Sequence, residues 1–158
     1  MIQIIAGAKG KGKTKILLDK VNTSIKEANG TIVYLDKNTK HMYELNNKIR
    51  LINVKDYCID TCQEFTGFIC GLISQDHDLE KVYLDSFLNI SCLEDGDITS
   101  VFEKLISDTI RLGRQALLLV PEIGLTPQVL RRFRSLFGER VAVIHSGLSM
   151  GVLMNTSG

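Results

Sequence analysis

The sequence predicts an α/β fold in which a parallel sheet is covered by helices on both faces. Three observations support this prediction. Apolar runs of strand length alternate with segments of helical periodicity, a glycine-rich turn joins the first apolar run to the first helical segment, and an aspartate ends a later apolar run. Ligands bind such sheets at the carboxyl ends of the strands. The turn and the aspartate are therefore expected at one edge.

The expected elements alternate through most of the chain. Residues 1–6 form an apolar run of buried-strand type, and residues 15–25 carry apolar side chains at helical spacing. By the same criteria, the remaining strands are expected over 31–35, 49–54, 81–85, 116–120 and 141–144, and the remaining helices over 62–74, 98–112 and 127–137. Residues 149–158 show no pattern and are expected to form a disordered tail.

The glycine-rich turn matches the phosphate-binding loop pattern G-x-x-x-x-G-K-[ST] at every fixed position. Its glycines let backbone N–H groups approach a phosphate, and the N-terminus of the following helix adds partial positive charge. Lys13 is expected to reach the β- and γ-phosphates, and the Thr14 hydroxyl to ligate Mg²⁺. The motif therefore predicts a P-loop NTPase-like fold with ATP and Mg²⁺ as cofactors. The nucleotide-binding residues expected from it are Gly7, Ala8, Lys9, Gly10, Lys11, Gly12, Lys13, Thr14 and Lys15.

The alternative for this motif is a glycine-rich turn that contains a lysine by chance. Lys9 and Lys11 either strengthen phosphate attraction or are solvated side chains of a tight turn. No motif that reads a nucleotide base is visible, so the preference among bases stays open.

Asp85 is the second chemical signal, because it ends the apolar strand 82–84 as a Walker B aspartate does. In that position it is expected to hold Mg²⁺ through water, beside Thr14; the alternative is a turn-capping role. Ser86 follows, where many ATPases of this class have a catalytic glutamate, so the sequence favours nucleotide binding or slow hydrolysis. Asp36 also ends a strand, and it is either a second polar group near the phosphates or a turn residue.

Composition places the chain among globular proteins of single-domain size: it has 158 residues, 44% hydrophobic and 23% charged. No apolar run reaches the ~18 residues of a membrane helix, and the N-terminus does not resemble a signal peptide. A cytoplasmic protein without membrane association is therefore expected. The cysteines lack the spacing of a zinc set, so reduced thiols are expected and a metal site is the weaker alternative. They are Cys58, Cys62, Cys70 and Cys92.

The charge changes sign along the chain. Residues 1–108 contain twelve Lys, one Arg and sixteen acidic residues, whereas residues 109–158 contain six Arg, no Lys and two acidic residues. All four cysteines lie in the first part and both prolines in the second. This change predicts a nucleotide-binding core over 1–108 and a second unit over 109–148, of separate sequence origin. The alternative is chance clustering in a short chain.

Four stretches of the first part, 5–15, 33–37, 65–71 and 82–87, resemble a family of small clostridial P-loop proteins labelled as twitching-motility or ATP-binding proteins. This resemblance spans residues 1–105 and implies nucleotide binding.

The second part resembles a different family. Residues 111–128, which begin Arg111-Leu112-Gly113 and include Val120-Pro121-Glu122, are similar to the motif Ia region of primosomal protein N′, the replication-restart helicase. Residues 131–134 and 141–148 continue the similarity, which ends at Leu148. It implies a strand, a helix and a strand that extend the sheet. The helicase's Walker B box, second RecA-like lobe and zinc-binding cysteines have no counterpart in the sequence.

The basic cluster of the second part offers candidate DNA contacts, namely Arg131, Arg132 and Arg134. A solvated helix face is the alternative for this cluster, and a polar strand end is the simplest interpretation of His145. The sequence is therefore compatible with three functions. The first is a P-loop protein that binds Mg-nucleotide and is a candidate slow ATPase. The others are a helicase-like fragment that contacts DNA, and a fusion product without function as a unit.

Overall fold

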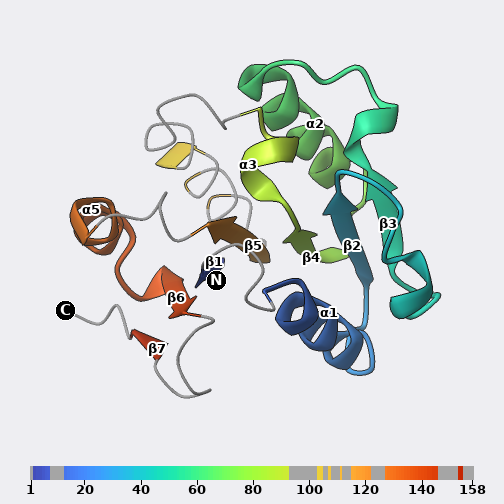
Figure 1. Ribbon diagram of the computed structural model, residues 1–158, viewed down its shortest axis with the longest axis horizontal. Coiled ribbons are helices and arrows are strands. Elements are labelled where there is room, and N and C mark those ends of the chain that lie inside the picture. Colours follow the sequence, from blue (N-terminus) through green and yellow to red (C-terminus); the bar gives the residue numbers. More distant parts are fainter. Residues whose placement is uncertain are drawn as a thin grey trace.

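The computed structural model describes residues 2–7, 13–92, 103–104, 107, 111, 115–121, 127–145 and 153–154. Within these residues seven strands form one sheet, in the spatial order β3-β2-β4-β5-β1-β6-β7 (Figure 1). The first six strands are parallel to their neighbours, and β7 is antiparallel to β6. The strands are β1 (Ile2–Gly7), β2 (Thr31–Asp36), β3 (Arg50–Asn53), β4 (Leu79–Leu84), β5 (Gln115–Pro121), β6 (Val141–His145) and β7 (Leu153–Met154).

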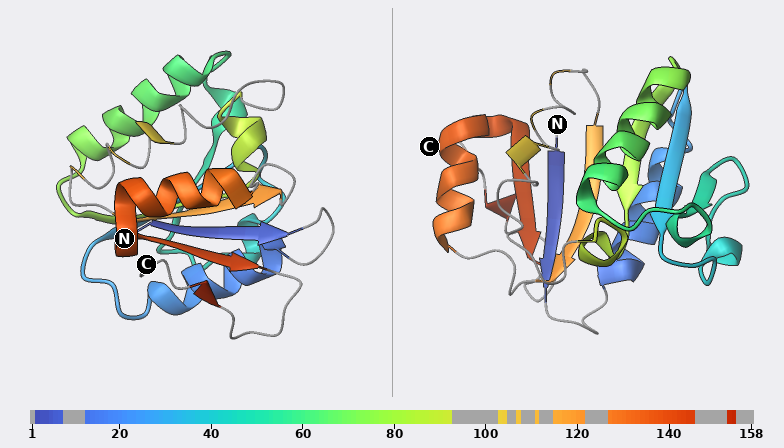
Figure 2. Two further views of the ribbon diagram at one scale, coloured as in Figure 1. Left: turned by 90° about the vertical axis from the view of Figure 1, so that its left-hand side faces the viewer. Right: turned by 90° about the horizontal axis from the view of Figure 1, so that it is seen from above.

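Helices cover both faces of this sheet. Helix α1 lies on one face, and α2 and α5 lie on the other (Figure 2). This arrangement follows from right-handed crossovers, because the connection from β1 to β2 through α1 runs in one direction along the sheet, whereas those through α2 (β3 to β4) and α5 (β5 to β6) run in the opposite direction. The helices are α1 (Lys13–Ser24), α2 (Cys62–Gln75), α3 (Phe87–Ile90) and α5 (Pro127–Phe137), with short 3₁₀ turns η1 (Met42–Glu44), η2 (Val54–Asp56) and η4 (Gly138–Arg140).

The sequence-predicted strands and the helices over 15–25, 62–74 and 127–137 are confirmed, with ends displaced by no more than a few residues. Part of the helix expected over 98–112 is described: Glu103, Lys104, Ser107 and Arg111 are helical, and the rest lies outside the described residues. Periodicity did not predict the 3₁₀ turns, because each is a single short turn.

Helix α1 is attached to the sheet by an apolar cluster. Leu17, Leu18 and Val21 of α1 are buried against Ile32 and Tyr34 of β2, with Tyr83 of β4 and Ile49 in the same cluster. The α1 residues have the i, i+4 spacing of one helix face, and the strand residues alternate as one face of a strand. Burial of this cluster therefore fixes which strand side chains face α1, and the site described below lies on that same face.

Helix α2 begins at a well-defined cap on the opposite side of the sheet. The Thr61 hydroxyl accepts a hydrogen bond from the Glu64 N–H at 3.1 Å, and a carboxylate oxygen of Glu64 accepts one from the Asp60 N–H at 3.1 Å. This reciprocal arrangement satisfies two N–H groups at the start of the helix. Phe65, Ile69 and Ile73 follow at intervals of four residues and are the buried residues of α2.

Strand β5 lies inside the sheet, between β4 and β1, and β6 pairs with the other side of β1. The segment 109–148 thus contributes strands on both sides of β1. Within the segment expected to be a tail, Leu153–Met154 form β7 beside β6, and the other tail residues lie outside the described part. The division into units 1–108 and 109–148 stays a prediction.

Candidate functional site

The carboxyl ends of the parallel strands meet at one edge of the sheet. Leu35 of β2 is in register with Leu84 of β4, so the next residues, Asp36 and Asp85, stand side by side. The Asp85 N–H donates to the Leu35 carbonyl oxygen at 2.9 Å, which continues the ladder by one residue. Because strand side chains alternate, both carboxylates lie on the face that α1 covers. Asp36 is 3% exposed and Asp85 is 4% exposed.

Tyr34 orients the Asp85 carboxylate from below. Its hydroxyl donates to Asp85 Oδ2 at 2.8 Å, and the ring is part of the cluster under α1. The pKa of Tyr34 is raised well above its ordinary value. Burial is the larger cause, and the negative charge of the neighbouring Asp85 carboxylate is the second. The hydroxyl therefore keeps its proton and remains a hydrogen-bond donor to the Asp85 carboxylate at the end of β4.

Asp36 is held by a backbone contact, since its Oδ1 accepts a hydrogen bond from the Lys37 N–H at 2.7 Å. Burial of the carboxyl, with the repulsion of Asp85 as the second cause, raises the pKa of Asp36 to about 6. The Lys37 N–H acts in the opposite direction and lowers it. Two adjacent buried carboxylates are the arrangement that a cation stabilises, because its charge offsets their mutual repulsion.

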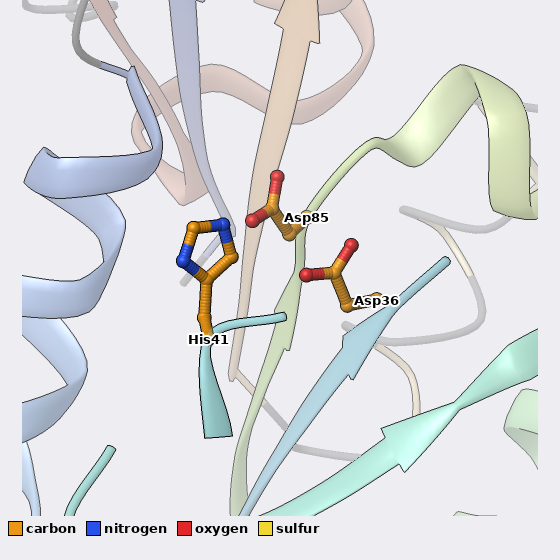
Figure 3. Close-up of side chains that lie close together, drawn as sticks. All are labelled: Asp36, His41 and Asp85. Carbon is orange, nitrogen blue, oxygen red and sulfur yellow. The ribbon is translucent and has the colours of Figure 1, made fainter. Parts of the chain in front are cut away.

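His41 completes the cluster from the loop that follows β2. One ring nitrogen of His41 and one oxygen from each of Asp36 and Asp85 lie within 4.8 Å of one another. Figure 3 shows the imidazole turned toward the two carboxylates. A search of the described residues for three or more His, Cys, Asp or Glu side chains close enough to bind one metal ion finds this group. The described cysteines form no such group, so the weaker alternative of a cysteine metal site receives no support.

The loop that carries His41 is tied to α1. Asn22 of α1 donates from Nδ2 to the Glu44 carbonyl oxygen at 2.7 Å, and its Oδ1 accepts from the Asn46 N–H at 2.8 Å. Glu44 in turn contacts His41, with 2.9 Å between Oε1 and Nδ1. These contacts place the imidazole over the edge formed by β2 and β4, and they connect it to the helix that begins at the glycine-rich motif.

The structure describes only part of the expected phosphate-binding loop. Gly7 is the last residue of β1 and Lys13 is the first residue of α1, so the motif joins a strand to a helix as expected. Thr14 is half-buried in the first turn of α1, and Lys15 is exposed. Ala8, Lys9, Gly10, Lys11 and Gly12 lie outside the described residues. The phosphate contacts of this loop therefore stay a prediction.

Asp85 occupies the position expected of a Walker B aspartate, at the carboxyl end of an inner strand. Oxygen ligands are those that Mg²⁺ prefers, and the Asp85 and Asp36 carboxylates with the Thr14 hydroxyl offer only oxygens. Ser86 follows with φ of 53°, a left-handed conformation uncommon for a residue other than glycine, and its carbonyl accepts hydrogen bonds from the Asn89 and Ile90 N–H groups. The chain thus turns sharply away from the edge directly after Asp85.

The sequence reasoning undervalued one site residue and missed another. Asp36 is a buried end residue of β2 beside Asp85, rather than a solvated turn residue. His41 was not considered, because a histidine in a polar loop belongs to no periodic pattern. Its only signal was a position five residues beyond the aspartate that ends a strand.

The arginine cluster lies on α5, the helix between β5 and β6. In the spatial order of the sheet, β6 is separated from β4, which ends at the carboxylates, by β5 and β1. Arg131 and Arg132 are exposed and Arg134 is half-buried. Arg132 forms an ion pair with Glu103, through Nε to Oε1 and through Nη2 to Oε2. His145 is the last residue of β6. These positions leave the candidate DNA contacts untested.

Comparison with known sequences finds local similarity to replication restart proteins. The chain is 52% identical over 58 residues to the replication restart protein PriA of Synechocystis, and 41% identical over 76 residues to PriA of Bacillus subtilis. These matches cover 37% and 48% of this chain but only 7% and 9% of the two relatives. The chain thus spans less than a tenth of their length. No protein-family profile matches the chain.

Comparison with solved structures shows the fold. The KaiC-like protein PH0186 of Pyrococcus horikoshii superimposes with a TM-score of 0.62 at 15% sequence identity, over 91% of this chain and 72% of that one. This chain has an α/β fold of the P-loop NTPase type. Among the described residues, no helix has both the length and the apolar character that crossing a membrane requires.

Proposed function

We propose that this protein binds ATP as its Mg²⁺ complex at the carboxyl edge of the sheet. The observation that carries the proposal is the position of Asp85, a buried carboxylate at the end of β4, oriented by Tyr34 on the face that α1 covers. The motif Gly7–Thr14 connects β1 to that same helix. A P-loop and a Walker B carboxylate on one edge form a two-part site for a metal-bound triphosphate.

Each part of this site has a separate role. The loop backbone between Gly7 and Lys13 binds the phosphates, with the N-terminus of α1 adding favourable charge. Lys13 contacts the β- and γ-phosphates, and Thr14 and Asp85 hold the magnesium ion, Asp85 through water. Bound Mg²⁺ neutralises phosphate charge. Ser86 provides no carboxylate next to Asp85, so hydrolysis is slow and nucleotide binding is the principal activity.

The test is calorimetric titration of the protein with MgATP, repeated on Lys13→Ala. We expect micromolar binding by the natural chain and a loss of affinity of about 100-fold or more in Lys13→Ala, because the lysine is the fixed cationic contact of the motif. The matched control is Lys26→Ala, which removes an exposed lysine just beyond the far end of α1 and leaves the affinity within about twofold. Absence of binding by a folded natural chain contradicts the proposal.

A second candidate function is DNA contact through α5. It is favoured by the similarity to replication restart protein PriA, together with the exposed Arg131 and Arg132 on that helix. DNA affinity that falls steeply with salt concentration, and that weakens in Arg131→Ala, supports this function. A shallow salt dependence contradicts it. The third interpretation is a fusion product without function as a unit. Observation of a single cooperative unfolding transition of the whole chain would contradict it.

A further inference from the structure

The cluster of Asp36, His41 and Asp85 differs from the ligand set of a magnesium–nucleotide site, because it contains nitrogen. Metal–ligand bonds of about 2.0–2.2 Å place ligand atoms up to roughly 4.4 Å apart around one ion. The three ligand atoms here lie within 4.8 Å of one another. Three atoms that lie about 4.8 Å from one another are roughly 2.8 Å from their common centre, so side-chain shifts of roughly 0.6 Å are enough to bring all three onto a common ion.

The contact between Glu44 and His41 prepares the imidazole as a ligand. Glu44 Oε1 lies 2.9 Å from Nδ1, which places the imidazole proton on Nδ1 when the ring is neutral. The other nitrogen, Nε2, then carries the lone pair. In Figure 3 one ring nitrogen of His41 faces the Asp85 carboxylate while the other faces away from it. A carboxylate behind a ligating histidine is the usual outer arrangement of metal sites, because it fixes the tautomer and the direction of the ring.

Charge provides a second, independent argument. Asp36 and Asp85 are each at least 95% buried, and they stand side by side at the ends of β2 and β4. Burial of two adjacent carboxylates is costly unless a cation neutralises them. The rigid elements that hold them, the ends of β2 and β4, keep the carboxylates together whether or not an ion is bound.

We propose that Asp36, His41 and Asp85 coordinate a divalent transition-metal ion directly, in the absence of nucleotide. One imidazole nitrogen and two carboxylate oxygens suit Mn²⁺, Fe²⁺, Co²⁺ or Zn²⁺ better than Mg²⁺, which prefers oxygen ligands and retains its waters. Three protein ligands leave further coordination positions for water or for a phosphate oxygen. If the nucleotide site is also confirmed, Asp85 is shared between the two, and the protein binds Mn-nucleotide in preference to Mg-nucleotide.

The experiment is a titration of the full chain with MnCl₂ without nucleotide, in which free Mn²⁺ is measured by electron paramagnetic resonance. We expect saturation at one ion per chain, and a loss of affinity of at least about tenfold in His41→Gln. The matched control is His77→Gln, which removes an exposed histidine just before β4, at the opposite edge of the sheet. This control should leave Mn²⁺ affinity unchanged. Thermal unfolding of both variants verifies that they are folded.

Replacement of Glu44 tests how the histidine is positioned. Glu44→Gln keeps the size of the side chain but removes the negative charge behind the imidazole, so Mn²⁺ affinity should fall by roughly tenfold. With Co²⁺ in place of Mn²⁺, the natural chain should show visible absorption bands, and His41→Gln should shift or lose them. An unchanged spectrum in His41→Gln means that the imidazole is not a ligand, and it overturns the proposal.

Two further outcomes also overturn it: equal Mn²⁺ affinity in the natural chain and His41→Gln, or an equal loss of affinity in His77→Gln. Because the titration contains no nucleotide, a failure of ATP binding does not alter its result. Conversely, MgATP binding without any nucleotide-independent Mn²⁺ binding supports the proposed function while it rejects the metal site.

Discussion

The two halves of the sheet are assembled in different ways. Strands β2, β3 and β4 come from the continuous segment 31–84, and this half carries the described site residues. The other half combines β1, from the N-terminus, with β5 and β6, from the segment that resembles the primosomal helicase. Pairing of strands within this one segment brings Asp36, His41 and Asp85 together. The phosphate-binding motif, by contrast, reaches this edge only through strands that follow it by more than a hundred residues.

Strand β5 connects the two halves. Lys81 to Leu84 of β4 pair with 115–118 on one side, and Ile2 to Gly7 of β1 pair with 116–121 on the other. No direct pairing of β1 with β4 exists among the described strands, since β5 lies between them. A site whose residues lie in the first part of the chain therefore depends on the second part for its geometry.

The largest effect is expected from removal of the second part. A variant that ends at residue 108 lacks β5 and β6, so β1 has neither of the strands with which it pairs. It should lose the cooperative unfolding transition and all measurable ATP binding. The measurements are urea unfolding followed by circular dichroism, and calorimetry with MgATP. A control variant that ends at residue 148 retains β5 and β6 and should bind ATP. Binding by the shorter variant would show that the first part is sufficient.

A proline in β5 should have the next largest effect. Leu117 pairs with Gln3 of β1 and with Tyr83 of β4, so Leu117→Pro interrupts the ladder at the centre of the sheet. We expect a loss of roughly 3 kcal/mol of unfolding free energy. The control is Arg50→Pro at the first residue of the edge strand β3, where proline is tolerated better. Equal destabilisation by the two prolines would contradict a central role of β5.

Asp36→Asn should stabilise the protein without metal. The pKa of Asp36 is raised to about 6 from 3.8, so the folded state binds this proton more tightly than the unfolded state. The contribution of protonated Asp36 to the free energy of unfolding is therefore fully present below about pH 4, and this contribution is lost as the pH rises to above 6. In EDTA at pH 7, Asp36→Asn should gain up to roughly 3 kcal/mol, and the gain should vanish near pH 4. A variant that is less stable at pH 7 would contradict this account.

The smallest effect concerns the hydrogen bond under Asp85. Tyr34→Phe removes the hydroxyl that donates to Asp85 Oδ2 but keeps the ring in its cluster. Loss of a donor to a buried carboxylate should lower the free energy of unfolding by about 1–3 kcal/mol, measured by urea titration at pH 7. Tyr43→Phe is the control, since Tyr43 is 91% exposed and its hydroxyl is solvated. A cost no larger than that of the control would mean that Tyr34 does not support the carboxylate.

The sequence was sufficient to predict what depends on neighbouring residues. Periodicity identified six of the seven described strands and three of the helices, because the alternation of strand side chains and the turn of a helix are set within a few residues. It did not identify β7, which lies in the segment expected to be a tail. The end of an apolar strand likewise singled out Asp85. Whether the loop between Gly7 and Thr14 contacts phosphate remains a prediction, because its central residues lie outside the described part.

Only the tertiary structure decided which strands are neighbours and which side chains meet. A strand's own residues do not specify its partner, so the position of β5 between β4 and β1 could not be read from its sequence. The same limit applied to His41, whose place beside Asp36 and Asp85 depends on a loop held by Asn22 of α1. Interactions between neighbouring residues determined the strands and helices and placed Asp85 at the end of its strand. Contacts between residues distant in sequence determined the order of the sheet and the three-residue cluster at its edge.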